Sequence, residues 1–279
     1  MSNRQPGRVS FIIPTRNNAR TISACVASAV AQPGDVEVLV IDNHSTDGTA
    51  DLARAARADL VIIAGPERSS QRNTGFDHAT GEIVAFIDSD MELDPGLADA
   101  LRVCFTDADV AAAVLPERSH GTGYLAASRA LEKRLAIGDP RVEAARAFRA
   151  SILDEVGPYD ETIAAFEDYE LADRVATRGG MVRAPVGVAH DEGRIRLAAL
   201  ARKKRYYGSQ WWAARSRLAP HRLAGRSVPL EVLRHDLLHV PGLVVLKMVD
   251  GLSLAAGAAQ AGREARRAER HGPSSVPTS

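Results

Sequence analysis

Short apolar runs alternate with amphipathic or alanine-rich segments through the first third of the chain. The apolar runs predict β-strands and the segments between them predict helices, because the two kinds of element differ in the spacing of their buried positions. Strands that alternate with helices pair in parallel through right-handed crossovers, a layout typical of nucleotide-binding α/β domains. The expected strands are residues 9–14, 36–41, 60–63 and 83–87, and the expected helices are residues 20–31, 46–58 and 69–79.

The pattern of the second half is less regular. Residues 121–137 are consistent with either a helix or a mobile segment. The apolar stretch 229–262 predicts helix with an interruption at Pro241 and Gly242, and residues 263–279, charged and then rich in Pro and Ser, are typical of a disordered tail. The other expected elements are helices over 95–105, 166–178 and 195–217, and strands over 110–115, 145–149, 181–184 and 187–190.

The length of 279 residues suits one large globular domain, or one domain with an appendage. We expect the α/β domain to occupy residues 1–225. A C-terminal helical extension over residues 226–264 and a disordered tail over residues 265–279 complete the expected organisation.

Composition narrows the function classes. The 35 Lys and Arg residues balance 35 Asp and Glu residues, so no global charge indicates nucleic acid as a partner. Cys25 and Cys104 are expected to be buried free thiols. The polar first eight residues do not resemble a signal peptide, and no stretch reaches the roughly 18 uncharged apolar residues that a membrane span needs. A cytoplasmic enzyme is the simplest expectation.

Two segments near the C-terminus leave more than one role open. Residues 202–212 mix basic and aromatic side chains, a composition that fits a diphosphate, an anionic acceptor, a lipid surface or a solvated helix face. Residues 243–254 are apolar but too short between charges to span a bilayer. Packing onto the domain, a homodimer contact and peripheral association with the inner face of a membrane all fit this segment.

The most informative motif is Asp88-Ser89-Asp90, which follows the apolar run 83–87. Its two carboxylates are expected at the carboxyl edge of the sheet, where ligands of open α/β sheets bind. Like charges repel there, so a divalent cation between them and a ligand is favoured, and hard oxygen ligands suit Mg²⁺ or Mn²⁺. The alternative is an exposed turn with two solvated acids.

Other polar residues follow the expected strands or begin the expected helices. Asp42 follows the second strand and is expected either to bind a nucleoside or to cap the next turn. Arg72 fits a partner carboxylate or phosphate, or a solvated helix face. Glu167 and Asp168 begin a helix, where they either cap it or supply a general base; His190 at a strand end is a candidate third metal ligand or a structural histidine.

The order of these motifs resembles the inverting family-two glycosyltransferases, which have the GT-A fold. The resemblance covers residues 8–210, and no single motif is as specific as their order. The motifs are Phe11-Ile-Ile-Pro-Thr-Arg-Asn17, Val40-Ile-Asp-Asn-His-Ser-Thr-Asp-Gly-Thr49, Gln71-Arg-Asn-Thr-Gly75, Gly81-Glu-Ile-Val-Ala-Phe-Ile-Asp-Ser-Asp90, Val156-Gly-Pro-Tyr-Asp160 and Glu167-Asp168.

The resemblance implies a mixed, mostly parallel sheet between helices that binds a nucleoside diphosphate sugar with Mn²⁺ or Mg²⁺. It implies that Asp90 binds the metal, that Asp88 contacts the ribose or the metal shell, and that His190 is a further metal ligand. Asp168 matches the catalytic base. The residues that match the nucleoside pocket or its surroundings are Pro14, Thr15, Asn17, Asp42 and Arg72.

Two positions depart from the family pattern: Asn43 replaces the usual second acid, and His44 replaces a frequent Gly. These departures bear on the identity of the nucleoside and not on the fold. The Gln-x-x-Arg-Trp motif of processive synthases is absent, so transfer of one sugar to an acceptor hydroxyl is favoured over chain extrusion. The acceptor is expected to be a cell-envelope glycan, a lipid carrier or a small molecule.

Three other functions fit the sequence less well. A nucleotidyltransferase needs a Gly-rich phosphate loop after the first strand, and a dinucleotide-dependent oxidoreductase needs Gly-x-Gly-x-x-Gly there; the sequence has neither. A non-catalytic module that binds nucleotide sugars or glycolipids predicts ligand binding without turnover. The presence of Asp88, Asp90 and Asp168 argues against such a module.

Overall fold

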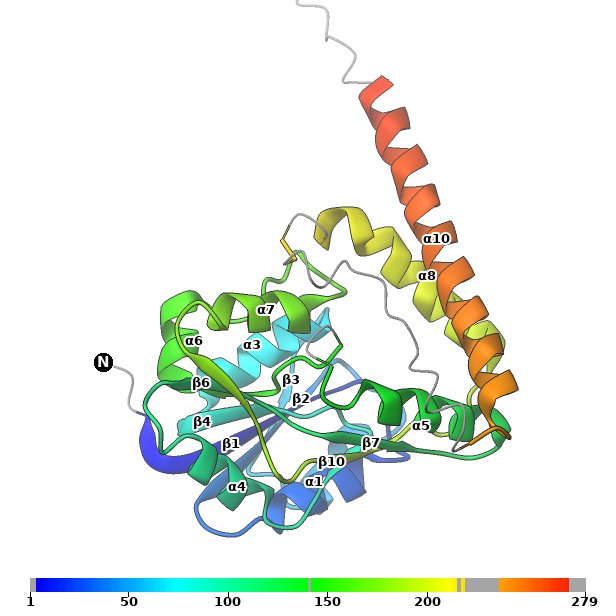
Figure 1. The fold of residues 1–279 in the computed structure, drawn as a ribbon. Coiled ribbons are helices and arrows are strands. Elements are labelled where there is room, and N and C mark those ends of the chain that lie inside the picture. Colours follow the sequence, from blue (N-terminus) through cyan, green and yellow to red (C-terminus); the bar gives the residue numbers. More distant parts are fainter. Residues whose placement is uncertain (1–3, 140–141, 215–216, 219–235, 271–279) are drawn as a thin grey trace, which may run out of the picture.

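A seven-stranded sheet forms the centre of the molecule, and helices cover both of its faces (Figure 1). The computed structural model describes residues 4–139, 142–214, 217–218 and 236–270. The strand order is β3-β2-β1-β4-β8-β6-β9. These strands are β1 Gln5–Thr15, β2 Val36–Asp42, β3 Leu60–Ile63, β4 Gly81–Phe86, β6 Val110–Val114, β8 Ala147–Arg149 and β9 Gly180–Arg183.

The first four strands pair in parallel, as the alternation of strands and helices predicts. β8 runs antiparallel to both β4 and β6, and β6 pairs in parallel with β9, so the sheet is mixed but mostly parallel. The expected fold class is confirmed. The helices that connect these strands are α1 Ile22–Val30, α2 Thr49–Ala55, α3 Arg68–His78, α4 Leu97–Cys104, α6 Ala150–Val156 and α7 Glu167–Val175.

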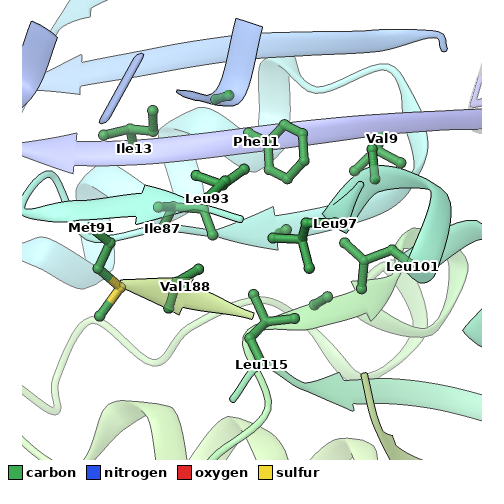
Figure 2. Packing of buried hydrophobic residues seen from close by; sticks show 14 of the residues in the cluster. Val9, Phe11, Ile13, Ile87, Met91, Leu93, Leu97, Leu101, Leu115 and Val188 are labelled. Carbon is green, nitrogen blue, oxygen red and sulfur yellow. The ribbon is translucent and has the colours of Figure 1, made fainter. Parts of the chain in front are cut away.

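Both faces of the sheet are buried, which explains why its central strands are continuous apolar runs. On β1, Val9, Phe11 and Ile13 point into one core layer, which Figure 2 shows in contact with Leu97 and other apolar side chains. Ile12 points into the layer on the opposite face. Because the central strands are anchored from two sides, their carboxyl ends form a fixed edge on which polar side chains can be placed.

A second sheet of three short strands lies beside this edge, in the order β5-β10-β7. Its strands are β5 Met91–Leu93, β7 Glu117–His120 and β10 Val188–Asp191. β10 pairs antiparallel with β5 and parallel with β7, and the backbone N–H of Asp191 donates to the carbonyl of Asp90 at 2.8 Å. The sheet therefore brings together three segments that are far apart in sequence. The hydrophobic pattern predicts β10 but neither β5 nor β7.

Three helices complete the described chain: α5 Tyr124–Ala136, α8 Leu197–Ala214 and α10 Val240–Arg270. Residues 121–137 are thus mainly helical. The predicted interruption at Pro241 and Gly242 is wrong, because the helix begins at Val240 and places Pro241 in its first turn, where a missing N–H breaks no helical hydrogen bond. The helix also extends past residue 263 to Arg270. The predicted boundary between residues 225 and 226, and residues 271–279, lie outside the described part.

The expectation that no segment is long and apolar enough to cross a membrane was too strict. Residues Val240–Glu264 of α10 have a mean hydropathy of 1.5 and pass that test by length and composition alone. The sequence expectation required an uncharged apolar stretch, and Lys247 and Asp250 interrupt this one. Both side chains form ion pairs with α5, so the charges are neutralised within the protein.

Candidate active site at the carboxyl edge of the sheet

Asp88 lies just after β4, where the sequence predicts an acid at the carboxyl edge. Its two carboxylate oxygens contact different guanidinium groups, at 3.2 Å from Arg72 and 3.1 Å from Arg146. Burial opposes ionisation of Asp88, but the Arg146, Arg68 and Arg72 guanidiniums outweigh burial and hold its pKa well below the usual range. Asp88 is therefore a fixed anion clamped between cations.

Arg72 is the centre of the charge network and is fully buried. It comes from α3. This helix can approach β1 closely because Gly75 has no Cβ; a Cβ there would collide with Ile12. Besides Asp88, its Nη1 contacts Asp168 at 2.8 Å and Glu167 at 3.2 Å. One arginine thus links the acid after β4 to the acids that begin α7. Asp88 and Asp168 are 80 residues apart in the sequence.

Asp168 lies in the first turn of α7 beside the partly exposed rim of the site, with 27% of its side chain exposed. The Tyr159 hydroxyl donates to Asp168 Oδ1 at 3.1 Å, and the Tyr159 ring lies under the Arg72 guanidinium at 4.8 Å. Glu167 is more buried, and burial together with the neighbouring Asp168 charge raises its pKa. Phe166 precedes both acids with a left-handed φ of 71°, a conformation that is uncommon for a bulky residue and is often found at functional sites.

Asp90 and His190 lie together because β5 pairs with β10. His190 Nε2 is 3.4 Å from Asp90 Oδ2, and its Nδ1 is 2.7 Å from Glu117 Oε1 on β7. Burial lowers the pKa of His190, but hydrogen bonds to Asp90 and Glu117 outweigh burial and raise it to about 10. Many histidines that bind a metal through one imidazole nitrogen donate the other ring N–H to a carboxylate. Glu117 is placed for that role if Nε2 faces the metal.

Two groups of possible cation ligands share His190. Single ligand atoms of Glu117, His190 and Glu192 lie within 4.8 Å of one another, and Asp90 lies on the other side of the imidazole. Carboxylate oxygens with one imidazole suit Mn²⁺, which accepts both. Asp88 differs from these residues, because both of its oxygens are engaged by arginines.

A cavity of about 440 Å³ opens between the ends of β1, β2 and β4. Pro14, Thr15 and Asn17 line it together with Asp88 and Asp90. The Thr15 hydroxyl is buried and, among the described residues, has no hydrogen-bond partner, which is unusual for a native protein. The other residues that line this cavity include Asn43, Gln71, His190, Arg68 and Lys203.

Asp42 is the last residue of β2. It is fully buried, and its carboxylate accepts hydrogen bonds from the backbone N–H and the hydroxyl of Ser45. It caps its own turn and does not line the cavity, whereas the adjacent Asn43 does. Contact of Asp42 with a nucleoside therefore stays a prediction, and Asn43 is the better placed of the two side chains.

A second cavity of about 280 Å³ is lined by Glu167 and Asp168, the two acids of α7 that contact Arg72. Arg68 lines both cavities, so they adjoin at this residue. α8 contributes to both as well: Lys203 lines the larger cavity, and Lys204 and Tyr207 line the smaller one. The structure thus provides two adjacent compartments, with Asp88, Asp90 and His190 in one and Glu167 and Asp168 among the four acids of the other.

Sequence reasoning missed two residues of this network, Arg146 and Glu117. Arg146 precedes β8 and is buried. Burial alone would lower its pKa, but the carboxylates of Asp88 and Glu117 outweigh burial and raise the pKa. A single arginine beside a short apolar strand was the available signal. Glu117 had no comparable signal, because strand β7 was not predicted. Tyr159 belongs to a quoted motif, but the sequence assigned it no role.

A family model for "Glycosyl transferase family 2" matches residues 10–155, which is more than half of the chain. The chain belongs to this family. The matched region contains Thr15, Arg72, Asp88 and Asp90, and it ends before Asp168 and His190.

Curated relatives support the assignment. A "Pre-mycofactocin glycosyltransferase" of Mycobacterium tuberculosis is 30% identical over 220 residues, which cover 72% of this chain and 46% of that protein. "Succinoglycan biosynthesis protein ExoU" of Rhizobium meliloti is 32% identical over 205 residues, which cover 62% of this chain and 58% of that protein. The chain spans only about half the length of these relatives.

Solved structures share the fold of this family-two chain. A mannosyltransferase from Pyrobaculum calidifontis, in complex with GDP-Man and Mn²⁺, has a TM-score of 0.56 and 23% identity, with 94% of this chain and 80% of that chain covered. Residues 1–349 of S. aureus TarS have a TM-score of 0.55 and 18% identity, with 96% and 93% covered. Both likenesses concern the fold alone.

Proposed function

We propose that this chain transfers one sugar from a nucleoside diphosphate sugar to a hydroxyl of an acceptor, with inversion at the anomeric carbon. The observation that carries the proposal is the Arg72 network, which joins the acid of the larger cavity to the acids of the smaller one. A donor in the first compartment and an acceptor in the second would meet at this network. Membership of glycosyl transferase family 2 supports the reaction class.

The larger cavity fits the donor. The unpartnered Thr15 hydroxyl and the Asn17 and Asn43 side chains offer hydrogen bonds to a nucleoside. Arg68 and Lys203 line the same cavity and offer positive charge to a diphosphate. Its volume of about 440 Å³ lies within the range of small-ligand sites. The Pyrobaculum mannosyltransferase with GDP-Man supports a nucleotide-sugar donor for this fold.

Of the carboxylates grouped around His190, Asp90 lines the larger cavity with it and Glu117 and Glu192 do not, so Asp90 and His190 would hold the divalent cation and Glu117 would orient the imidazole. When bound, Mn²⁺ or Mg²⁺ would neutralise the negative charge that develops on a diphosphate leaving group. Asp88 would act beside the cation and not as its main ligand, because Arg72 and Arg146 hold both of its oxygens.

Asp168 would be the general base. Its carboxylate is held by Arg72 and Tyr159 on one oxygen and lines the acceptor-side cavity. A carboxylate in this position can accept the proton of an acceptor hydroxyl as the hydroxyl oxygen attacks the anomeric carbon and the diphosphate leaves from the opposite face. A single displacement of this kind inverts the configuration and needs no carboxylate nucleophile.

A donor panel tests the function. The purified chain is incubated with UDP-, GDP- and dTDP-sugars, each with Mn²⁺, Mg²⁺ or EDTA, and release of the nucleoside diphosphate is measured. We expect one donor class to be cleaved slowly to water and release to stop with EDTA. Donor binding without any release, even with extracts that contain candidate acceptors, would indicate the non-catalytic binding module instead.

Glu117→Gln tests the metal site. The amide still fills the space but presents a poorer hydrogen-bond partner to His190 Nδ1. We expect the Mn²⁺ dissociation constant to rise about 10- to 100-fold, the usual cost of removing an outer-shell carboxylate. Calorimetric titration of Mn²⁺ in the presence of the nucleoside diphosphate measures the change. Glu143→Gln is the matched control, because Glu143 lines the neighbouring cavity away from His190; an equal loss in both variants would contradict the assignment.

A further inference from the structure

α10 lies at the edge of the molecule (Figure 1), and one of its faces exposes apolar side chains along most of its length. Val244, Met248 and Leu252 are 52%, 58% and 69% exposed. Successive helical residues are separated by about 100°, so the exposed residues of this stretch share one side of the helix. The exposed face consists of Pro241, Val244, Val245, Met248, Gly251, Leu252, Ala255, Ala256 and Ala259.

The opposite face of α10 packs on the domain and holds the charges. Asp250 is buried there and pairs with Arg129 of α5 at 3.0 Å, and Lys247 at the flank pairs with Glu132. Gly257 lies so close to α8 that a Cβ there would collide with the carbonyl of Arg205. A helix on a water-exposed surface normally has one apolar side, which is turned inward; α10 buries Leu243 and Leu246 on its packed side and also carries apolar residues on its exposed side.

Basic residues follow the exposed apolar face. Arg263, Arg266 and Arg267 are exposed and continue on the same side of the helix. Two large apolar residues at the other end, Leu237 and Leu238, are 71% and 72% exposed. The described residues of the face itself, from Pro241 to Ala259, include no acid.

We propose that the exposed face of α10 docks on the surface of an anionic lipid bilayer. The apolar side chains would enter the boundary between headgroups and acyl chains, and the arginines would meet anionic headgroups. The helix would lie along the membrane and not across it, because its opposite face is packed on α5 and α8. A second copy fits less well, since an antiparallel partner would place the arginines against Leu237 and Leu238, where no complementary acidic cluster is described.

The position of α8 connects this surface to the active site. Between α8 and α10 lies an apolar groove of about 310 Å³, lined by Trp211, Leu254 and Ala255 among others. Ala255 belongs to the exposed face of α10, and Phe166 lines both the groove and the cavity of Asp168. If the proposed function holds, docking would present this cavity to an amphiphilic acceptor whose hydroxyl lies at the membrane surface.

Vesicle flotation tests the docking. The full chain is mixed with vesicles of phosphatidylcholine alone or with added phosphatidylglycerol. We expect flotation with the anionic vesicles, and at least a tenfold weaker affinity for a double variant with Met248→Glu and Leu252→Glu. Replacing Arg263, Arg266 and Arg267 by Ala should weaken binding about 100-fold, because each surface arginine contributes roughly fivefold. Val103→Glu is the matched control: it changes an apolar residue of α4 that is 70% exposed and should not affect flotation.

Three outcomes would overturn the docking proposal. The wild-type chain stays with the unbound fraction; or Val103→Glu weakens flotation as much as the double variant; or light scattering shows a dimer that the double variant dissociates, without vesicle binding, which assigns the face to a second copy. Release of nucleoside diphosphate is measured separately without vesicles. The docking proposal and the proposed function can therefore fail independently.

Discussion

Asp168→Asn is expected to lower kcat by a factor of about 10² to 10⁴, the usual contribution of a general base. The asparagine amide has nearly the same shape, and its oxygen can still accept hydrogen bonds from Arg72 and Tyr159. It cannot accept the proton of an acceptor hydroxyl. Initial rates of nucleoside diphosphate release in the presence of the acceptor measure the loss, and thermal shift with nucleoside diphosphate and Mn²⁺ should show that donor binding survives.

Glu167→Gln is the matched control for this prediction, because the two acids are adjacent in the first turn of α7 and both contact Arg72. Glu167 is the more buried of the two, and burial and Asp168 raise its pKa. We expect this variant to retain turnover within about tenfold of wild type. The opposite ranking, with Glu167→Gln nearly inactive and Asp168→Asn active, would move the role of base to Glu167.

The sequence predicts the sheet better than the site. Strands β2 and β3 are runs of branched residues between clear turn signals, and most of β2 is buried, so local pattern alone predicts them. The acids at the ends of these runs follow from the same logic, because the carboxyl ends of parallel strands meet at one edge. Asp88 and Asp90 were found in this way.

The connections between distant segments could not be predicted from local pattern. β5 and β7 have three and four residues, too few for a period to emerge, and their pairing with β10 is what places Glu117 beside His190. The role of Arg72 as the link between Asp88 and Asp168 depends in the same way on how α7 packs beside α3. Asp42 shows the converse, since a polar residue at the predicted edge turned inward to cap its own turn.

Arg72→Met is expected to lower the free energy of unfolding by about 3–5 kcal/mol, the range measured when one partner of a buried ion pair is removed. Methionine fills much of the same space, so the loss reports on charge more than on volume. Without the guanidinium, Asp88, Glu167 and Asp168 lose their shared cation in a site where Arg72 is fully buried. Urea unfolding of the metal-free chain, followed by circular dichroism, measures the difference.

Arg54→Met is the control, because Arg54 forms an ion pair with Asp51 on the surface of α2, where both side chains are more than half exposed. Its effect should stay within about 0.5 kcal/mol. The pH dependence distinguishes lost charge from lost packing. Since the folded-state pKa of Asp88 lies below its ordinary value of 3.8, its ion pairs stabilise the fold fully above that value and are lost as pH falls through the folded-state pKa. The difference between wild type and Arg72→Met should therefore shrink in acid, and a difference that is constant down to acid unfolding would show that Arg72 acts through packing alone.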